Sequence, residues 1–315
     1  MVCLFHWCNN DVPTIISHFI YLGSIGVDIF VFLSGFGLYF SFSKDSRVTT
    51  FYVKRGLRIV PPYWLGLLTL QVIALIRVGQ MNVGLLLEEM FFVDFWINEV
   101  SVYWYLPFIV LLYLFFPIYY KAVDTINKKR LLLIGVIIIC FGSHFIPGLE
   151  ATKYTLAYDR LPVFILGSIV AQHIIEESSP RFELGKRQIP LLVFAFFACL
   201  FASLLYIDKY YLKPYNLKFY FYLPLSVLII LLSTLLFKLD RSMIFVKALN
   251  IIGTLSLELY ISHVIILFLM DKYIIITNTV MNLISFLILS LVSAYLLKKV
   301  GNLISGKLSK IILHK

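Results

Sequence analysis

Two residues near the start of the chain could act together in acid–base chemistry. His6 lies in a short apolar segment over residues 1–8, and Asp28 lies within GVDIFVFLSGF at 26–36. A carboxylate beside a His fixes its tautomer and raises its basicity, so the pair is a candidate base with its orienting acid. The alternative is that backbone or loop groups satisfy each side chain separately.

A second candidate is the basic stretch FYVKRGLRIVPPY at 51–63. Arg55 and Arg58 are three residues apart, so they share one face of a helix. Two guanidinium groups on one face suit the phosphates of a nucleotide-bearing ligand. Basic residues beside a helix end also orient membrane proteins and bind anionic lipids, and by charge count this interpretation is the simpler one. Pro61 and Pro62 are expected to start or kink the following helix.

A third candidate is the segment GTLSLELYISH at 253–263. Its small residues are explained by close helix packing. Glu258 and His263 are five residues apart and do not share a helical face well. Because ionisable groups at membrane depth are functional by default, both remain candidates for a functional role.

The composition indicates which elements must position these residues. Of 315 residues, 61% are hydrophobic and 14% are charged, with a mean hydropathy of +0.92. A soluble fold has too little interior to hide so much apolar surface. Apolar runs of about 20 residues recur, each long enough to cross a bilayer. Segments such as 131–141 and 225–237 lack the alternation of barrel strands. The sequence therefore predicts an all-α, polytopic transmembrane helix bundle that forms a single domain over 1–315.

Nine full spans and an N-terminal stub are expected, about ten helices with the first truncated. The spans are predicted at 19–42, 59–78, 101–120, 131–147, 158–175, 189–207, 219–237, 250–271 and 274–297. The five segments predicted to lie in the cytoplasm hold 20 of the 27 Lys and Arg residues, as the positive-inside rule requires. They are 43–58, 121–130, 176–188, 238–249 and the tail after 297, so the C-terminus is expected in the cytoplasm.

Neither a nucleic acid nor a metal ion is an expected partner. The net charge of +10 is explained by loop charges that set orientation. The cysteines have no metal-ligand spacing, and at least two of them sit in apolar runs, where a free Cys behaves as a small hydrophobe. The four are Cys3, Cys8, Cys140 and Cys199.

These motifs, taken together, resemble the acyltransferase-3 family of membrane proteins. The resemblance begins with a His in the first helix, GVDIFVFLSGF and the basic FYVKRGLRIVPPY. Later matches follow in the same order and cover nearly the whole chain. They are Trp104-Tyr105-Leu106 with Tyr113 and Pro117, then Arg160-Leu161-Pro162-Val163-Phe164 with Gly167, and finally GTLSLELYISH.

The resemblance implies an enzyme that transfers acyl groups other than amino-acyl groups. Such proteins move an acyl group, often acetyl, from cytoplasmic acyl-CoA to a carbohydrate hydroxyl, for example on a cell-surface polysaccharide. It implies a multi-pass protein of the plasma membrane, with the bilayer, the acyl-CoA co-substrate and the carbohydrate acceptor as partners. The catalytic His falls on His6, its acid on Asp28, and the acyl-CoA-binding cations on Arg55 and Arg58. Supporting motif positions are Ser34, Gly35, Phe36, Trp104, Arg160, Glu258 and His263.

Two expectations follow about the start of the chain and about the reaction. Residues 1–8 cannot span a bilayer, so we expect either that the natural protein begins upstream or that this is a truncated gene product. Family members usually carry an Arg roughly ten residues before the His, and this sequence begins too late to hold one, which bears on whether the first helix is complete and the chain active. His6 either activates the hydroxyl as a base or carries the acyl group transiently. The competing class is a polytopic transporter or polysaccharide exporter, which also places ionisable groups within its helices.

Overall fold

The regular secondary structure of the described residues consists of helices. The computed structural model describes residues 1–7, 20, 22–79, 82–99, 101–146, 148, 153–176, 190, 194, 197–200, 224–231, 244–273 and 278–313. No strand occurs within these ranges, which confirms the all-α class for them. Most of the spans predicted at 189–207 and 219–237 lies outside the described residues.

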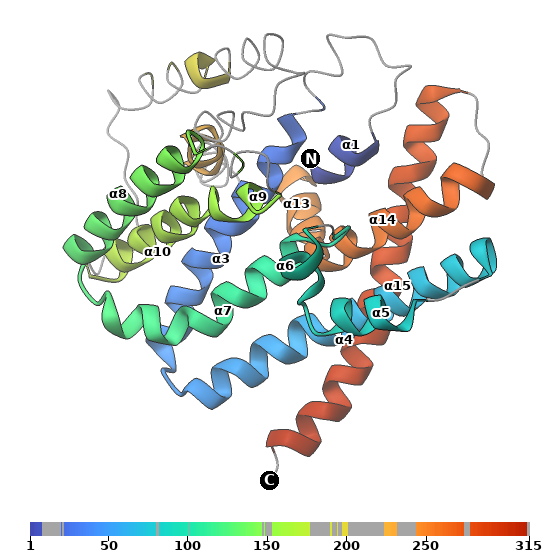
Figure 1. Cartoon of the computed structure of the whole chain (residues 1–315), viewed down its shortest axis with the longest axis horizontal. Helices are drawn as coiled ribbons and strands as arrows, with labels where there is room; N and C mark the ends of the chain where they lie inside the picture. Colours follow the sequence, from blue (N-terminus) through green and yellow to red (C-terminus); the bar gives the residue numbers. More distant parts are fainter. Residues whose placement is uncertain are drawn as a thin grey trace. The chain divides into compact units, whose positions relative to one another are not determined.

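Figure 1 shows the helices along the chain. They are α1 (Val2–Trp7), the 3₁₀ turn η1 (Leu22–Ser24), α3 (Ile25–Lys44), α4 (Val48–Val78), α5 (Val83–Met90), α6 (Asp94–Asn98), α7 (Tyr105–Ala122), α8 (Ile126–Ser143), α9 (Thr155–Tyr158), α10 (Leu161–Glu176), α13 (Ile244–Thr254), α14 (Ser256–Tyr273) and α15 (Thr279–Leu313).

Several of these helices are long and apolar enough to cross a membrane. Four qualify singly, and a fifth span forms if Lys247–Thr254 and Ser256–Asp271, bent by 72° at their junction, are counted together. The four are Leu22–Lys44, Val48–Arg77, Tyr105–Ala122 and Thr279–Ile312. These spans support a membrane protein, while the count of about ten helices and the bundle arrangement stay predictions.

Helix boundaries differ from the prediction at the basic ends. α4 begins at Val48, so most of the expected 43–58 loop is helical, and Pro61 and Pro62 lie inside the helix rather than at its start. Membrane helices tolerate proline because neighbouring groups satisfy the freed backbone carbonyls. α15 likewise continues to Leu313, beyond the predicted tail start. These segments were predicted as loops because they are rich in Lys and Arg, but a helix that extends beyond the bilayer also carries charged residues.

The chain divides into two compact units, each assembled from segments far apart in sequence. The first comprises Met1–Phe5, Pro13–Val48 and Leu111–Leu239, and the second comprises His6–Val12, Thr49–Val110 and Asp240–Lys315. The first therefore contains α3, α8 and α10, and the second contains most of α4 together with α14 and α15. The prediction of a single domain stays a prediction.

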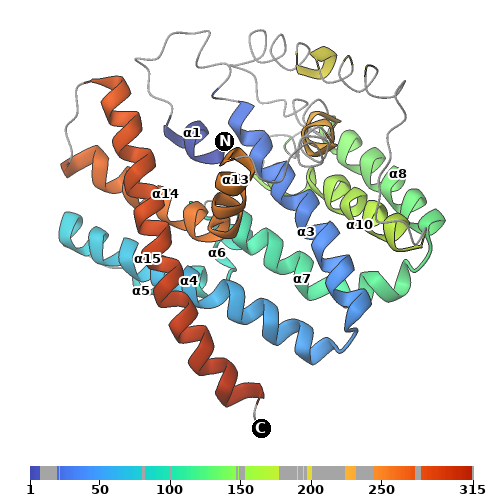
Figure 2. The same ribbon diagram turned by 180° about the vertical axis from the view of Figure 1, so that it is seen from behind.

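In the first unit, α3 and α10 touch backbone to backbone through glycines. A Cβ on Gly35 would lie 2.2 Å from the carbonyl oxygen of Phe164, and one on Gly167 would lie 2.2 Å from that of Phe32. Small residues permit such close approach between membrane helices. Figures 1 and 2 show the two helices side by side from opposite directions. Gly35 of the predicted motif is thus a packing residue.

Gly35→Ala is expected to lower the thermal stability of the protein in detergent. The added methyl would overlap the α10 backbone, which cannot yield as a flexible side chain can, and overpacking of this kind costs about 1–3 kcal/mol. Gly37→Ala is the matched control, because Gly37 lies in the same helix and a Cβ added there would meet nothing within 4 Å. Equal unfolding midpoints for the two variants would contradict the close packing.

In the second unit, α14 is fixed by contacts with its neighbours. The Tyr103 hydroxyl donates to the carbonyl oxygen of Ile261 over 2.9 Å. Gly66 of α4 leaves room for the Ile261 side chain, whose Cγ2 would lie 2.2 Å from an added Cβ. Ser262 donates to the Ser290 carbonyl oxygen of α15 over 3.2 Å. The candidate residues of α14 are therefore held on a fixed helix.

Candidate functional site

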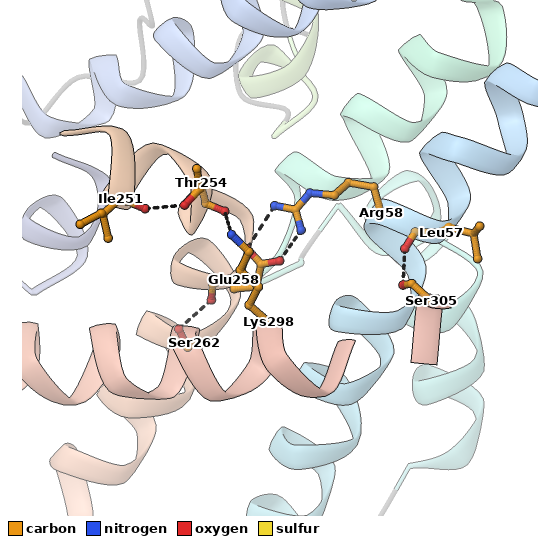
Figure 3. A network of polar contacts seen from close by, with 8 residues as sticks. All are labelled: Leu57, Arg58, Ile251, Thr254, Glu258, Ser262, Lys298 and Ser305. Atoms are coloured by element: carbon orange, nitrogen blue, oxygen red, sulfur yellow. Dashed lines mark hydrogen bonds and ion pairs between the residues drawn. The ribbon is translucent and has the colours of Figure 1, made fainter. Parts of the chain in front are cut away.

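Arg58 and Glu258 form a bidentate ion pair within the second unit. Arg58 Nη2 donates to Glu258 Oε2 over 3.1 Å, and Nη1 donates to Oε1. The Glu258 side chain is 1% exposed, whereas that of Arg58 is 41% exposed. Glu258 lies in the first turn of α14, where the helix dipole favours a negative charge. The buried acid thus fixes a cation that stays accessible (Figure 3).

A cavity of about 220 Å³ opens beside this ion pair. Its lining residues come from α4, α14 and α15, and they are Leu57, Arg58, Pro62, Glu258, Gly301, Asn302 and Ser305. Ser305 Oγ donates to the Leu57 carbonyl oxygen over 2.7 Å and so ties α15 to α4. Lys298 donates to the Thr254 carbonyl oxygen over 2.8 Å, as Figure 3 shows, and adds a second cation to this network. Glu258 balances the charge of Arg58, so Lys298, whose hydrogen-bond partner is a neutral carbonyl, supplies the positive charge that an anionic ligand would meet.

Arg55 lies on the same helix as Arg58, as predicted from their spacing. Its guanidinium carbon is 5.7 Å from the centroid of the Phe51 ring, a cation–π distance. The Arg55 side chain is partly buried, and its guanidinium contacts the Phe51 ring near the N-terminal end of α4. Arg55 and Arg58 therefore form a basic face on one continuous helix.

The structure brings together two histidines that the sequence placed in separate motifs. The ring centroids of His6 and His263 are 5.2 Å apart, with the planes inclined by 44°. His6 is exposed, whereas His263 is fully buried. Both residues belong to the second unit, which also contains the Arg58 cavity.

Asp28 has an arginine as its ionic partner. Arg160 Nε lies 3.3 Å from Asp28 Oδ1, and both side chains are buried in the first unit. This pair joins two predicted motifs, one on α3 and one at the start of α10. His6 belongs to the other unit, so its expected pairing with Asp28 stays a prediction.

The first unit also contains a buried His–Asp pair that was not predicted from the sequence. His144 Nε2 lies 3.1 Å from each carboxylate oxygen of Asp159, and both side chains are 1% exposed. The signal was present, because His144 lies near the end of the span predicted at 131–147 and Asp159 near the start of the span predicted at 158–175. Asp159 also interacts electrostatically with Arg160 and Asp28, so the four side chains form one charged cluster.

The remaining motif residues contribute to packing. Phe36 stacks near Phe32, with centroids 6.4 Å apart, and near Phe40 at 4.9 Å. The Trp104 ring lies 6.2 Å from that of Phe95. Ser34 is partly buried on α3, one residue before Gly35 of the glycine contact. Within the described ranges, no group of three His, Cys, Asp or Glu residues could hold a metal ion.

One buried cation outside the predicted spans has a structural role. Burial lowers the pKa of Lys129, in the predicted 121–130 loop, to about 8. Its ammonium donates to the Val123 carbonyl oxygen just after α7 and lies 5.0 Å from the centroid of the Tyr39 ring. A lysine that caps the last carbonyls of a helix in this way stabilises the helix end.

Comparison with known proteins agrees with the resemblance drawn from the motifs. The family model described as an acyltransferase domain, acyltransferase-3, matches residues 1–299. Acyltransferase MdmB of Streptomyces mycarofaciens is 28% identical over 195 residues, which are 52% of this chain and 50% of that protein. The chain thus matches about half the length of this curated relative. No solved structure is a significant match. The family match covers nearly the whole chain and includes every motif described above, so the chain belongs to the acyltransferase-3 family.

Proposed function

We propose that this protein is a membrane-bound O-acyltransferase. It moves an acyl group, acetyl in the simplest case, from cytoplasmic acyl-CoA to a hydroxyl of a carbohydrate such as a cell-surface polysaccharide. It resides in the plasma membrane with its C-terminus in the cytoplasm. The observation that carries the proposal is the accessible Arg58 guanidinium, fixed beside a cavity by the fully buried Glu258.

The cavity has the chemistry of a donor site. Acyl-CoA carries several phosphates, and the Arg58 guanidinium, which uses two of its five N–H groups on Glu258, has three further N–H groups that can donate to phosphate. Arg55 and Arg58 lie on one helix, and Lys298 belongs to the same polar network. All three belong to segments that the charge distribution assigns to the cytoplasmic side, where acyl-CoA is found.

The donor site and the histidine pair are linked by a single helix. Glu258 and His263 both lie on α14, and five residues correspond to a helical rise of about 7.5 Å. The flexible pantetheine arm of acyl-CoA can cover this distance while its phosphates stay at Arg58. This favours a thioester that reaches toward His6 from the cytoplasmic side.

The reaction needs a base, because a sugar hydroxyl is a poor nucleophile at neutral pH. In the direct route His6 takes the hydroxyl proton as the oxygen attacks the thioester carbonyl carbon. A C–O bond forms, the C–S bond breaks, and the departing thiolate receives the proton from His6. In the relay route a His6 nitrogen attacks the thioester carbonyl carbon, a C–N bond forms as the C–S bond breaks, and the thiolate takes the ring N–H proton. The hydroxyl oxygen then attacks the acyl carbon, a C–O bond forms as the C–N bond breaks, and the hydroxyl proton returns to the imidazole. Acyl label that stays on protein without acceptor would distinguish the relay.

Arg55→Ala and Arg58→Lys are each expected to weaken CoA binding by about tenfold to a hundredfold. A hydrogen bond to a charged group contributes about 1.5–3 kcal/mol, and lysine cannot reproduce the bidentate fork. Calorimetric titration of the purified protein with CoA measures the change. Arg47→Ala is the control, since Arg47 is 75% exposed and pairs with Asp45 in the same basic segment. Normal CoA binding by both variants would show that the basic cluster only orients the protein.

Transfer from labelled acyl-CoA separates the enzyme from the transporter alternative. Membranes that contain the protein are expected to release CoA and to fix label on carbohydrate. A transporter or exporter would bind or move its cargo without breaking the thioester. Unchanged acyl-CoA, with no label on carbohydrate, would favour that class.

A further inference from the structure

His263 presents a buried nitrogen that the folded chain does not satisfy. Its Nδ1 lies 3.1 Å from the Leu259 carbonyl oxygen, which can only accept a hydrogen bond, so Nδ1 carries the proton. Nε2 is then a bare acceptor, and within the described part of the chain it has no hydrogen-bond partner. The side chain is fully buried. Buried polar atoms without partners are rare in native proteins and call for an explanation.

The imidazole of His6 lies beside the imidazole of His263. The ring centroids are 5.2 Å apart. When an N–H···N hydrogen bond joins two imidazoles, the two nitrogens lie about 3 Å apart. Adding the distance from each nitrogen to its own ring centroid gives a centroid separation similar to that of His6 and His263. A small rotation of His6 about its side-chain bonds therefore suffices to form the bond.

The position of His6 is fixed by its neighbour in α1. Trp7 is buried, and its Nε1 donates to Asn282 Oδ1 of α15 over 2.9 Å. The Tyr260 ring also lies near His263, with ring centroids 5.7 Å apart. His6 is thus an exposed imidazole at an anchored helix end, and His263 is a fixed imidazole packed behind it.

We propose that His263 is the positioning residue of His6, an inference that rests on the proposed acyl transfer. Nε2 of His263 accepts a hydrogen bond from one N–H of His6. This bond sets the tautomer of His6 and leaves its other ring nitrogen as the acceptor for the substrate hydroxyl. His263 itself neither touches the substrate nor exchanges a proton.

A neutral imidazole suits this role. His6 becomes positively charged when it takes the hydroxyl proton, and a hydrogen bond from a charged donor is about twice as strong as a neutral one. The bond to His263 therefore stabilises the protonated state more than the resting state. The Leu259 carbonyl holds the His263 ring in its tautomer, just as a third group orients the base in catalytic triads.

Steady-state kinetics of His263 variants test the proposal. His263→Leu, of similar size but without an acceptor, is expected to lower kcat by about tenfold to a hundredfold, as when the second partner of a functional imidazole is lost. KM for acyl-CoA stays unchanged, because the Arg58 cavity is intact. His263→Gln restores most of kcat, since its amide oxygen is an acceptor. His173→Leu is the control, an exposed histidine in α10 of the first unit.

The outcomes separate this inference from the proposed function. If the wild-type protein transfers no acyl group, the proposed function is wrong. If the wild type is active and His263→Leu keeps its kcat, the inference alone is wrong. A Gln variant as slow as the Leu variant also overturns it, because buried shape rather than an acceptor would then matter. If His263→Leu does not fold, His263→Met serves as the apolar variant. In a His6→Ala background, His263→Leu is expected to cause no further loss.

Discussion

His6→Ala is expected to lower acyl transfer by about 10²–10⁴-fold, the usual contribution of a general base. His6 is the exposed member of the histidine pair, so it is the imidazole that a substrate hydroxyl can reach. A relay mechanism predicts an equal or larger loss, because the acyl carrier itself would be missing. The measurement is turnover of labelled acyl-CoA per folded molecule.

Two controls show that the loss is chemical. CoA binding is expected to stay normal in His6→Ala, because the cavity lining comes from α4, α14 and α15 and does not include α1. His173→Ala, at an exposed position of α10, is expected to retain full turnover. Wild-type turnover in purified His6→Ala would end the proposal that His6 is the base. Attention would then move to Glu258 and His263, the other acid and base deep in one helix.

The helical class and the local role of several motifs could be predicted from the sequence, because both depend on short-range patterns. Apolar runs indicate spans whatever the tertiary arrangement. The spacing of Arg55 and Arg58 was sufficient to place them on one helix, where the structure also has them. Small residues were a less regular guide, because Gly35 packs against α10, whereas a Cβ on Gly253, in the segment for which close packing was predicted, would meet nothing within 4 Å.

The partners of the ionisable groups could not be predicted in this way. Arg58 and Glu258 are 200 residues apart in sequence, and periodicity states which residues share a face but not which faces meet. Asp28 and Glu258, as acids within apolar segments, were recognisable from the sequence as charges that require partners in a membrane. Choosing between the possible pairings required the packing of α3 on α10 and of α4 with α14.

Arg160→Met is expected to destabilise the protein by about 3–5 kcal/mol, the cost of breaking a buried ion pair by removing one partner. Arg160 is the arginine of a cluster that also contains the buried carboxylates of Asp28 and Asp159. Without it, these two acids face each other with His144 as the remaining basic group. Thermal unfolding in detergent, followed by intrinsic fluorescence, measures the loss.

Asp28→Asn is expected to cost less stability than Arg160→Met, since Arg160 keeps its interaction with Asp159. Combining Arg160→Met with Asp28→Leu should recover part of the stability that Arg160→Met loses. The second substitution removes the Asp28 carboxylate, which would otherwise be buried without a cation. A double variant less stable than Arg160→Met would contradict the pairing of Arg160 with Asp28.

Turnover per folded molecule then decides which role Asp28 has. If Asp28 orients His6, as the motif resemblance implies, Asp28→Asn lowers turnover even after normalisation to folded protein. If Asp28 serves only Arg160, turnover per folded molecule equals that of the wild type while the unfolding midpoint falls. The contact with Arg160 involves Asp28 Oδ1, and the second carboxylate oxygen can accept from another group, so the ion pair alone does not decide between the two roles. Turnover of Asp28→Asn per folded molecule, set beside that of His263→Leu, therefore shows whether Asp28, His263 or both orient His6.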